Sequence, residues 1–457
     1  MMITPAQENE RMLARLLGVG EDQASEKLDR RVAITHGDGA AVLFGKELAE
    51  QLGRTIHIGD GGACDLEVVV NARPATPVKE RLFITLDESF ISVSATPVPP
   101  SGSNVELHGL QTVIGACYTA GTVLARLVDG IEPAPKVDPF VIRFDALGAN
   151  RRLLERAISL NNAVLVGAGA VGNGFLRGAR HLRIGGALAV ADPKVVGSGN
   201  PNRCLYFDED DVDRPKAARL CEKAQPDFSD LRLDPFEGTF AELVKGRGRV
   251  RRAIVAADSR RARRSIQKDL PLEVLDASTT DVSEIIVHSH RQPTSGACLA
   301  CIYRHIHDEL ARERDIASGL GVDLADVAAG ALIDDRVAQK IGSQHPGLNA
   351  GALVGRAFDS LFKQLCGEQA LLTATGAQAL APFAFVSNLA GALLALELAR
   401  FDSADRFQDG RNYLFVSPWA PPDRHTRRHR GREADCEFCN RPETRKALAA
   451  VWPEHGF

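Results

Sequence analysis

A glycine-rich segment directly after a short apolar run constrains the fold of this chain more than any other feature. The apolar run 163–166 is followed by GAGAVG, in which Gly167, Gly169 and Gly172 have the spacing G-x-G-x-x-G, and then by helical periodicity. Gly167 permits a tight turn, Gly169 lets the backbone approach a phosphate, and the helix N-terminus offers unpaired N–H groups. The pattern predicts a strand, a phosphate-binding turn and a helix, which is the first unit of a parallel nucleotide-binding sheet.

Polar residues after the next strand favour a triphosphate over a nicotinamide cofactor. Asp192 follows the apolar run 186–191, where a carboxylate can accept hydrogen bonds from ribose hydroxyls. Asn200, Arg203 and Lys216 come soon after it, and cations at these positions can neutralise charge that develops on phosphates. Asp258 ends a later strand and is placed to hold a magnesium ion.

The spacing of these residues resembles that of a known superfamily. Asp192, Asn200, Arg203 and Lys216 match the motif D-x-D-x-x-x-x-S-N-x-N-R, followed by a lysine, of the ThiF/MoeB and ubiquitin-activating enzymes. The resemblance implies that Asp192 binds ribose, that the other three residues contact the phosphates of ATP, and that Asp258 serves magnesium.

Three positions depart from that motif. Its second aspartate is replaced by Lys194, its serine by Gly199, and the glutamine usual after the arginine by Cys204. We expect the lysine to alter the metal or nucleotide environment, and the other two changes to be less decisive.

Two C-x-x-C pairs predict a structural zinc site. Cys298 and Cys301 form one pair, and Cys436 and Cys439 form the other. Two intervening residues let both thiolates of a pair reach one tetrahedral ion, and four thiolates leave no open coordination position. The nine cysteines, an odd number, argue against a disulfide framework in a chain with no recognisable secretion signal.

The resemblance also implies a nucleophilic cysteine that accepts the activated acyl group as a thioester. Cys366, between the first zinc pair and the last long helix, is the candidate, and a buried structural cysteine is the alternative reading. Cys204, beside Arg203, is the second candidate. Three further free cysteines fall in segments that we interpret as core: Cys64, Cys117 and Cys221.

The expected fold class is α/β, a Rossmann-like, doubly wound and mostly parallel sheet. An N-terminal α/β domain without a glycine loop (1–135) is expected to be an inactive adenylation-like half, and a proline-rich linker precedes the active adenylation domain (140–301). A helical insertion (302–375) carries Cys366, and the C-terminal part of the adenylation domain (376–457) carries the second zinc pair.

The resemblance, in a layout like that of stand-alone bacterial activating enzymes of antiviral defence operons, implies ATP-dependent adenylation of the C-terminal carboxylate of a ubiquitin-like protein. A conjugating enzyme would then be a further partner, and ATP, Mg²⁺ and Zn²⁺ the cofactors. Adenylation of a sulfur carrier, as by ThiF and MoeB, and a non-catalytic binding protein with this fold are the alternatives. A monomer and a homodimer both remain open.

Composition narrows the choice of partners. The chain is 44% hydrophobic and 25% charged, with a formal net charge of −4, so its charge gives no reason to expect nucleic acid as a partner. No run of about 18 uncharged apolar residues occurs, and no signal peptide is apparent, so we expect a cytoplasmic protein without a membrane span.

Overall fold

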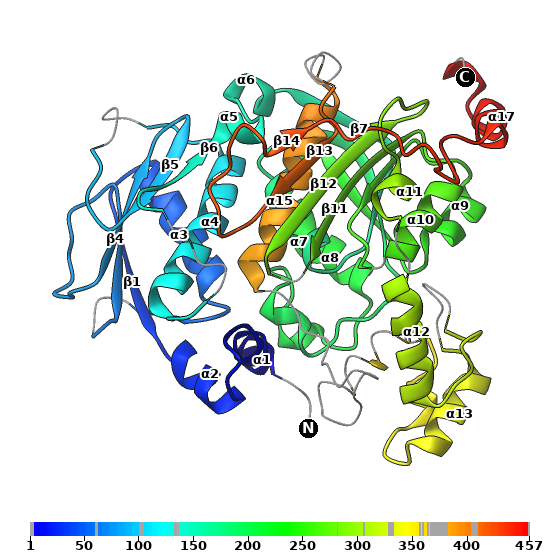
Figure 1. The fold of residues 1–457 in the computed structure, drawn as a ribbon, viewed down its shortest axis with the longest axis horizontal. Helices are drawn as coiled ribbons and strands as arrows, with labels where there is room; N and C mark the ends of the chain where they lie inside the picture. The colour runs from blue at the N-terminus through cyan, green and yellow to red at the C-terminus, as the bar shows by residue number, and fades with distance from the viewer. Residues whose placement is uncertain are drawn as a thin grey trace.

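The computed structural model has two β-sheets on either side of a layer of helices (Figure 1). The residues that it describes are 4–59, 63–99, 105–131, 135, 137–258, 260–280, 282–304, 307–327, 333–355, 358, 361–362, 365, 383–403 and 410–455.

The first sheet is built by the N-terminal part of the chain. Its strands, from one edge to the other, are β2 (His57–Gly59), β1 (Arg31–His36), β3 (Leu66–Val70), β4 (Arg81–Leu86), β5 (Phe90–Ser94) and β6 (Phe140–Arg143). The strands β2, β1, β3 and β4 run parallel, whereas β5 and β6 are antiparallel to their neighbours.

The second sheet contains the glycine loop. Its strands, in spatial order, are β14 (Arg427–Arg428), β13 (Tyr413–Val416), β12 (Glu284–Arg291), β11 (Glu273–Thr280), β10 (Arg252–Val255), β7 (Ala157–Val166), β8 (Arg183–Ala191) and β9 (Leu231–Phe236). From β9 to β11 the strands are parallel and lie in the order third, second, first, fourth, fifth. This is the order of the first five strands of a Rossmann sheet, so the predicted fold class is confirmed.

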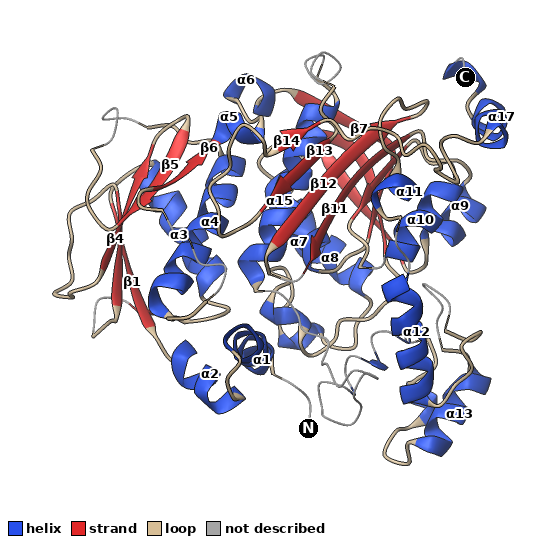
Figure 2. Cartoon of the chain, in the orientation of Figure 1, coloured by secondary structure: helices blue, strands red, loops and turns tan. Residues whose placement is uncertain are grey.

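Four helices fill the space between the sheets (Figure 2): α3 (Ala40–Leu52), α4 (Gly109–Leu127), α7 (Ala170–Ala179) and α15 (Ala384–Phe401). The helix α3 follows the first strand of its sheet as α7 follows β7, and α4 precedes β6 as α15 precedes β13. The two sheets therefore repeat one arrangement, with three or more parallel strands followed by antiparallel ones.

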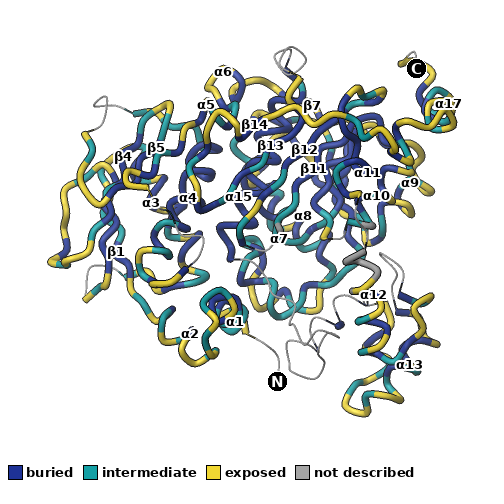
Figure 3. Tube along the Cα trace, in the orientation of Figure 1, coloured by how far each residue is buried: buried dark blue, intermediate teal, exposed yellow. Residues whose placement is uncertain are grey.

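Helix α15 forms the centre of this layer. It is long and apolar enough to cross a membrane by length and composition, but all 18 of its residues are buried within the protein (Figure 3). It packs closely on α7 because both helices present glycines. A Cβ atom on Gly391 would lie 2.3 Å from the backbone carbon of Gly174, and one on Gly174 would lie 2.8 Å from Cα of Asn388.

The other helices that the structure describes lie outside this layer, and three of them, Phe240–Arg247, Arg260–Lys268 and Leu299–Ile302, pack on the opposite face of the second sheet. These other helices are α1 (Pro5–Leu17), α2 (Glu21–Leu28), α5 (Phe144–Leu147), α6 (Arg151–Leu154), α8 (Lys216–Ala224), α9 (Phe240–Arg247), α10 (Arg260–Lys268), α11 (Leu299–Ile302), α12 (His307–Leu320), α13 (Asp335–Gln344) and α17 (Pro442–Val451). The helices α12 and α13 project from the body and enclose a small hydrophobic core of their own.

One expected boundary differs from the structure. The sequence places the start of the second domain at residue 140, but residues 140–143 form β6 and pair with β5 in the first sheet. Phe140 and Ile142 are buried in the main core, whereas the proline-rich stretch before them suggested a linker between domains. The chain therefore passes to the second sheet through α5 and α6.

Candidate nucleotide and metal sites

The glycine loop connects β7 to α7 at the point where the order of the parallel strands reverses. Gly167 has φ +106°, and a Cβ atom there would lie 2.7 Å from the carbonyl oxygen of Ala256. A Cβ atom on Gly172 would lie 2.1 Å from the carbonyl oxygen of Gly167. Gly169, the N-cap of α7, has open space around its Cα. Two of the glycines thus permit the turn to close, and Gly169 leaves room for a ligand at the helix N-terminus.

Asp192 directly follows β8 and holds two backbone segments together. One carboxylate oxygen accepts a hydrogen bond from the N–H of Ala168 at 2.8 Å, and the other accepts one from the N–H of Lys194 at 2.8 Å. The side chain is 7% exposed. Asp192 therefore holds the glycine loop against the turn after β8. This structural role is separate from the expected role of Asp192 in binding ribose.

Asn200 and Arg203 lie on a short 3-10 turn that packs against α1. The side chain of Asn200 accepts from the N–H of Gly197 at 2.9 Å, and Arg203 donates to the side-chain oxygen of Asn202 at 2.8 Å. The side chain of Asn202 in turn donates to that of Asn9 on α1 at 3.4 Å. Helix α1 of the N-terminal part thus supports a loop of the second sheet.

Lys216 is the first residue of α8 and lies close to the turn after β8. Its N–H donates to the carbonyl oxygen of Lys194 at 2.9 Å, and its side chain is buried, with 8% exposed. Burial lowers the pKa of Lys216, and the nearby Asp192 partly offsets that effect. Asp192 and Lys216, which the sequence places 24 residues apart, therefore lie in one charged cluster.

Asp258 follows β10 and faces a cation. Lys194 Nζ donates to its carboxylate at 2.7 Å. Within the described part of the chain, the only group of three or more potential metal ligands that converge is the four-cysteine cluster. The ammonium group of Lys194 neutralises the carboxylate of Asp258 and opposes the binding of a divalent ion there, which bears on the expectation that Asp258 serves magnesium.

The four zinc-pair cysteines converge in the structure. Their sulfur atoms all lie within 4.8 Å of one another, and all four side chains are buried. The Sγ–Sγ distances are 3.8 Å from Cys298 to Cys301, 3.7 Å from Cys298 to Cys436 and 3.6 Å from Cys301 to Cys439. Zinc–sulfur bonds of about 2.3 Å in a tetrahedron require sulfur atoms about 3.8 Å apart, so the cluster fits a four-thiolate zinc site.

Backbone groups around the cluster support thiolate ligands. The N–H of Glu433 points to the sulfur of Cys301, and the N–H of Phe438 to that of Cys436, each at 3.5 Å. Hydrogen bonds of this kind favour the deprotonated sulfur that binds zinc. The cluster joins the segment after β12 to the tail after β14, so its role is structural.

Cys366, the predicted acyl acceptor, lies outside the described residues. Leu365, directly before it, is buried in the small core shared with α12 and α13. The role of Cys366 as the nucleophile stays a prediction.

The three buried free cysteines that the structure describes outside the zinc pairs show no sign of activation. Burial raises the pKa of Cys117 and Cys204, and it raises that of Cys221 to about 12. All three thiols are buried, and Cys64 is partly exposed. Cys204, the second candidate, is thus held in its protonated form although Arg203 and Lys216 lie close enough to act on it.

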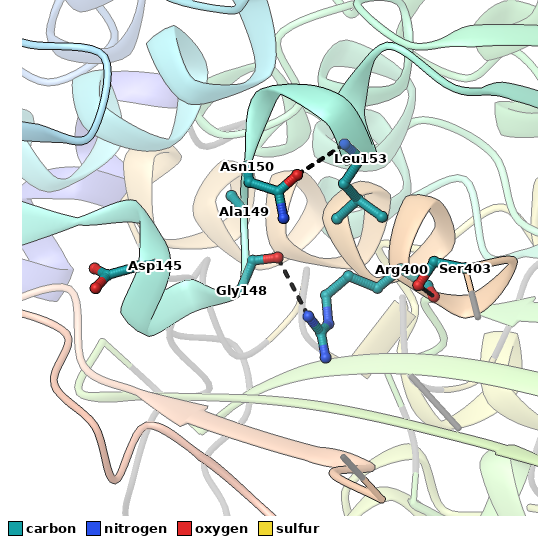
Figure 4. A pocket seen from close by; sticks show the side chains of 7 residues that line it. All are labelled: Asp145, Gly148, Ala149, Asn150, Leu153, Arg400 and Ser403. Atoms are coloured by element: carbon teal, nitrogen blue, oxygen red, sulfur yellow. Dashed lines mark hydrogen bonds between the residues drawn. The ribbon is translucent and has the colours of Figure 1, made fainter. Parts of the chain in front are cut away.

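A cavity of about 200 Å³ lies away from the glycine loop, between α5, α6 and the C-terminal end of α15 (Figure 4). Arg400 points into it and donates to the carbonyl oxygen of Gly148 at 3.2 Å, while the side chain of Asn150 caps α6. Because it lies at the connection between the two sheets, this cavity is separate from the glycine loop at 167–172.

Sequence reasoning missed one residue that shapes the glycine loop. Asn173 is fully buried and donates to the carbonyl oxygens of Ala168 and Gly169, at 3.1 and 3.0 Å. Its own oxygen accepts from the N–H of Tyr206 at 3.1 Å, which ties the loop to the segment after Arg203. A polar residue within an otherwise small and apolar helix start was the only signal in the sequence.

A family model described as the E1 N-terminal domain matches residues 2–150. The N-terminal third resembles an E1 domain. The match lies outside the glycine-loop motif, so a second part of the chain supports the predicted resemblance to the ThiF/MoeB and ubiquitin-activating enzyme superfamily. No curated protein sequence matches the chain.

The solved structures that match this chain are distant from it. E. coli MccB with ATP is 14% identical, with 79% of this chain and 98% of that chain covered and a TM-score of 0.36. The E. coli tRNA N6-threonylcarbamoyladenosine dehydratase TcdA is 15% identical, with 58% and 91% covered and a TM-score of 0.30. PaaA is 15% identical, with 60% and 72% covered and a TM-score of 0.33.

Proposed function

We propose that this chain uses ATP to adenylate the C-terminal carboxylate of a ubiquitin-like protein. The observation that carries the proposal is the meeting of three features at one end of the second sheet. The glycine loop opens the N-terminus of α7 to an anion, Lys216 brings a buried ammonium group beside it, and Arg203 lies on the adjoining turn. An anion as highly charged as a triphosphate suits this combination of dipole and cations.

The chemistry is a displacement at the α-phosphorus. A carboxylate oxygen of the substrate tail forms the new P–O bond, and the bond to the bridging oxygen of the β-phosphate breaks, so that pyrophosphate leaves with the electron pair. Negative charge grows on the phosphate oxygens in the transition state. Arg203 and Lys216 would stabilise this charge because they are held in place before the reaction begins.

The second step of the proposal is transfer to a cysteine. A thiolate attacks the carbonyl carbon of the adenylate, a C–S bond forms, and AMP leaves as the C–O bond breaks. Cys366 is the proposed nucleophile, and a conjugating enzyme is the proposed recipient of the thioester. The E1 N-terminal match favours this pathway over a small-molecule substrate.

A second candidate is adenylation of a sulfur-carrier protein, in which the same adenylate receives sulfur. The proposed nucleotide site would serve the activation of a ubiquitin-like protein and of a sulfur carrier equally well. What distinguishes the two is whether a thioester on the enzyme forms.

The test is ATP–pyrophosphate exchange with purified ubiquitin-like proteins encoded near the gene, followed by gel analysis with and without a reducing agent. We expect exchange only with a protein whose C-terminal glycine is intact, and a thiol-sensitive adduct in the wild type. A matched control is the same protein lacking that glycine. Exchange without an adduct favours the sulfur-carrier reaction, and no exchange with any candidate contradicts adenylation.

A further inference from the structure

The ion pair of Lys194 and Asp258 spans the mouth of the glycine loop. Lys194 lies in the turn after β8, Asp258 follows β10, and these two strands flank β7 on either side. The Nζ–Oδ2 distance is 2.7 Å. The lysine side chain is 16% exposed and the aspartate side chain is 52% exposed, so solvent and ligands reach the pair from the aspartate side.

The pair changes the charge of the site. Four formal positive charges and two negative ones lie within electrostatic reach of Lys216 or of the neighbouring Cys204: Arg54, Lys194, Arg203 and Lys216, with Asp192 and Asp258. An acidic residue at position 194 would convert the net charge of this set from +2 to 0. The difference of two units equals the charge of one divalent cation.

The two nearby carboxylates already accept hydrogen bonds from other groups of the protein. Both oxygens of Asp192 accept backbone hydrogen bonds, and Asp258 accepts one from an ammonium group. A magnesium ion requires oxygen ligands in near-octahedral geometry and loses its water reluctantly. At Asp258 it would also have to displace or lie against the charge of Lys194, which opposes its binding.

We propose that the ammonium group of Lys194 takes the place of a divalent cation in this site, so that the chain binds a nucleoside triphosphate without needing a metal ion. The inference rests on the proposed function, since it presupposes that a triphosphate occupies the glycine loop. Lys194 holds Asp258 and adds its charge to those of Arg203 and Lys216. It acts as a specificity-determining residue that selects the metal-free form of the ligand.

The experiment measures binding of a non-hydrolysable ATP analogue to the full-length protein by calorimetry, in excess EDTA and in excess MgCl₂. For the wild type we expect dissociation constants within about threefold of each other. For Lys194→Asp we expect a loss of at least about tenfold in EDTA, with recovery in MgCl₂, because the variant lacks the internal cation and gains a second carboxylate.

A second readout does not involve nucleotide. Electron paramagnetic resonance of added Mn²⁺ should show no ion bound at this site in the wild type and about one bound ion in Lys194→Asp, beyond any ion bound elsewhere in both. Lys194→Met, which is neutral and similar in length, separates loss of the ammonium group from gain of a carboxylate and should also weaken binding in EDTA. The matched control is Lys340→Met, which removes the ion pair between Lys340 on α13 and Asp323 after α12 and should change neither readout.

The outcomes separate the two proposals. Wild-type binding that requires Mg²⁺, or Lys194→Asp and Lys194→Met variants that bind in EDTA as the wild type does, would overturn the role of Lys194 and leave the nucleotide site intact. A wild type that binds the analogue in neither condition would overturn the proposed function, and this inference with it.

Discussion

Lys216 is the single residue on which the proposed chemistry depends most directly. It begins α8, its side chain is buried, and no side chain in the described part of the chain accepts a hydrogen bond from its ammonium group. A buried cation without such a partner is available to a phosphate oxygen. We expect Lys216→Met to lower ATP–pyrophosphate exchange by about a hundredfold, since it removes charge that opposes the transition-state charge.

The control for this variant is Lys245→Met on the exposed part of α9, which should exchange as the wild type does. Thermal melting checks that both variants are folded. An unchanged exchange rate in folded Lys216→Met would contradict the assignment of this lysine to the phosphates.

His181 lies where helices of the two sheets meet, and its titration makes the stability of the protein depend on pH. This residue follows α7 and lies against the start of α4 at Gly109. Burial, together with Arg180, lowers its pKa to about 4 from 6.5. The unfolded chain thus binds a proton between these pH values that the folded protein does not, so stability is complete above pH 6.5 and is lost as the pH falls toward 4.

The shift corresponds to about 3 kcal/mol at most across that range. Urea unfolding at pH 7 and pH 5 measures the change, and His181→Gln should reduce the difference between the two. His429→Gln, on an exposed loop, is the matched control. An equal pH dependence in His181→Gln and the wild type would show that other groups cause it.

At the scale of elements, the contact between α7 and α15 holds the glycine loop to the core. Gly391 lies so close to Gly174 that a methyl group has no space. We expect Gly391→Ala to destabilise the protein by about 1–3 kcal/mol through overpacking of two helix backbones. Chemical denaturation measures this.

Gly246→Ala, inside α9, is the matched control because nothing lies within 4 Å of the added methyl group. Alanine should stabilise that helix by about 0.5–1 kcal/mol. The two variants have the same chemistry and opposite expected signs, so a destabilisation shared by both would argue against overpacking as the cause.

Local sequence patterns predicted the elements well where one physical rule decides the structure. The apolar runs at 163–166 and 186–191 predicted the ends of β7 and β8. The glycine spacing predicted the loop before α7. The strand at 140–143 was placed in the wrong domain because pairing across the chain, which the sequence does not show, assigns it to the first sheet.

At the candidate sites, the meeting of the four cysteines was predicted, whereas the roles of the residues around the glycine loop stay predictions. The cysteine spacing predicted the cluster because two C-x-x-C pairs suit one tetrahedral ion. The pairing of Lys194 with Asp258 could not be predicted, since 64 residues separate them and only the sheet order makes them neighbours. The support that Asn9 on α1 gives to the turn at Asn202 is a contact of the same long-range kind.

At the scale of the whole molecule, a buried ion pair joins the two repeated halves. Arg177 on α7 donates to both carboxylate oxygens of Glu47 on α3, at 3.1 and 2.8 Å, and also contacts Glu50. Gln51 donates to Glu47 as well, at 2.8 Å. Because a buried charge without its partner is costly, this contact fixes how the halves meet, and it ties the N-terminal half to the helix that follows the glycine loop.

The four-cysteine cluster makes the second long-range connection. It joins the segment at 298–301 to the C-terminal tail at 436–439, across about 135 intervening residues. Helix α17 follows the cluster, and there Leu448 and Trp452 pack against Leu272 at the start of β11. Two contacts therefore hold the tail on the second sheet, the four-cysteine cluster and the packing of α17.

We expect about one equivalent of zinc per chain by elemental analysis of protein prepared without chelators. A strong chelator should lower the melting temperature and expose the tail beyond residue 430 to proteases, while the glycine loop stays protected. Cys301→Ser should act like the chelator, because three thiolates hold zinc less tightly than four. Cys64→Ser, which lies outside the cluster, is the control and should melt as the wild type does. Protein free of zinc, or a Cys301→Ser variant with an unchanged melting temperature and protease pattern, would contradict a structural zinc site, because the packing of α17 alone would then hold the tail in place.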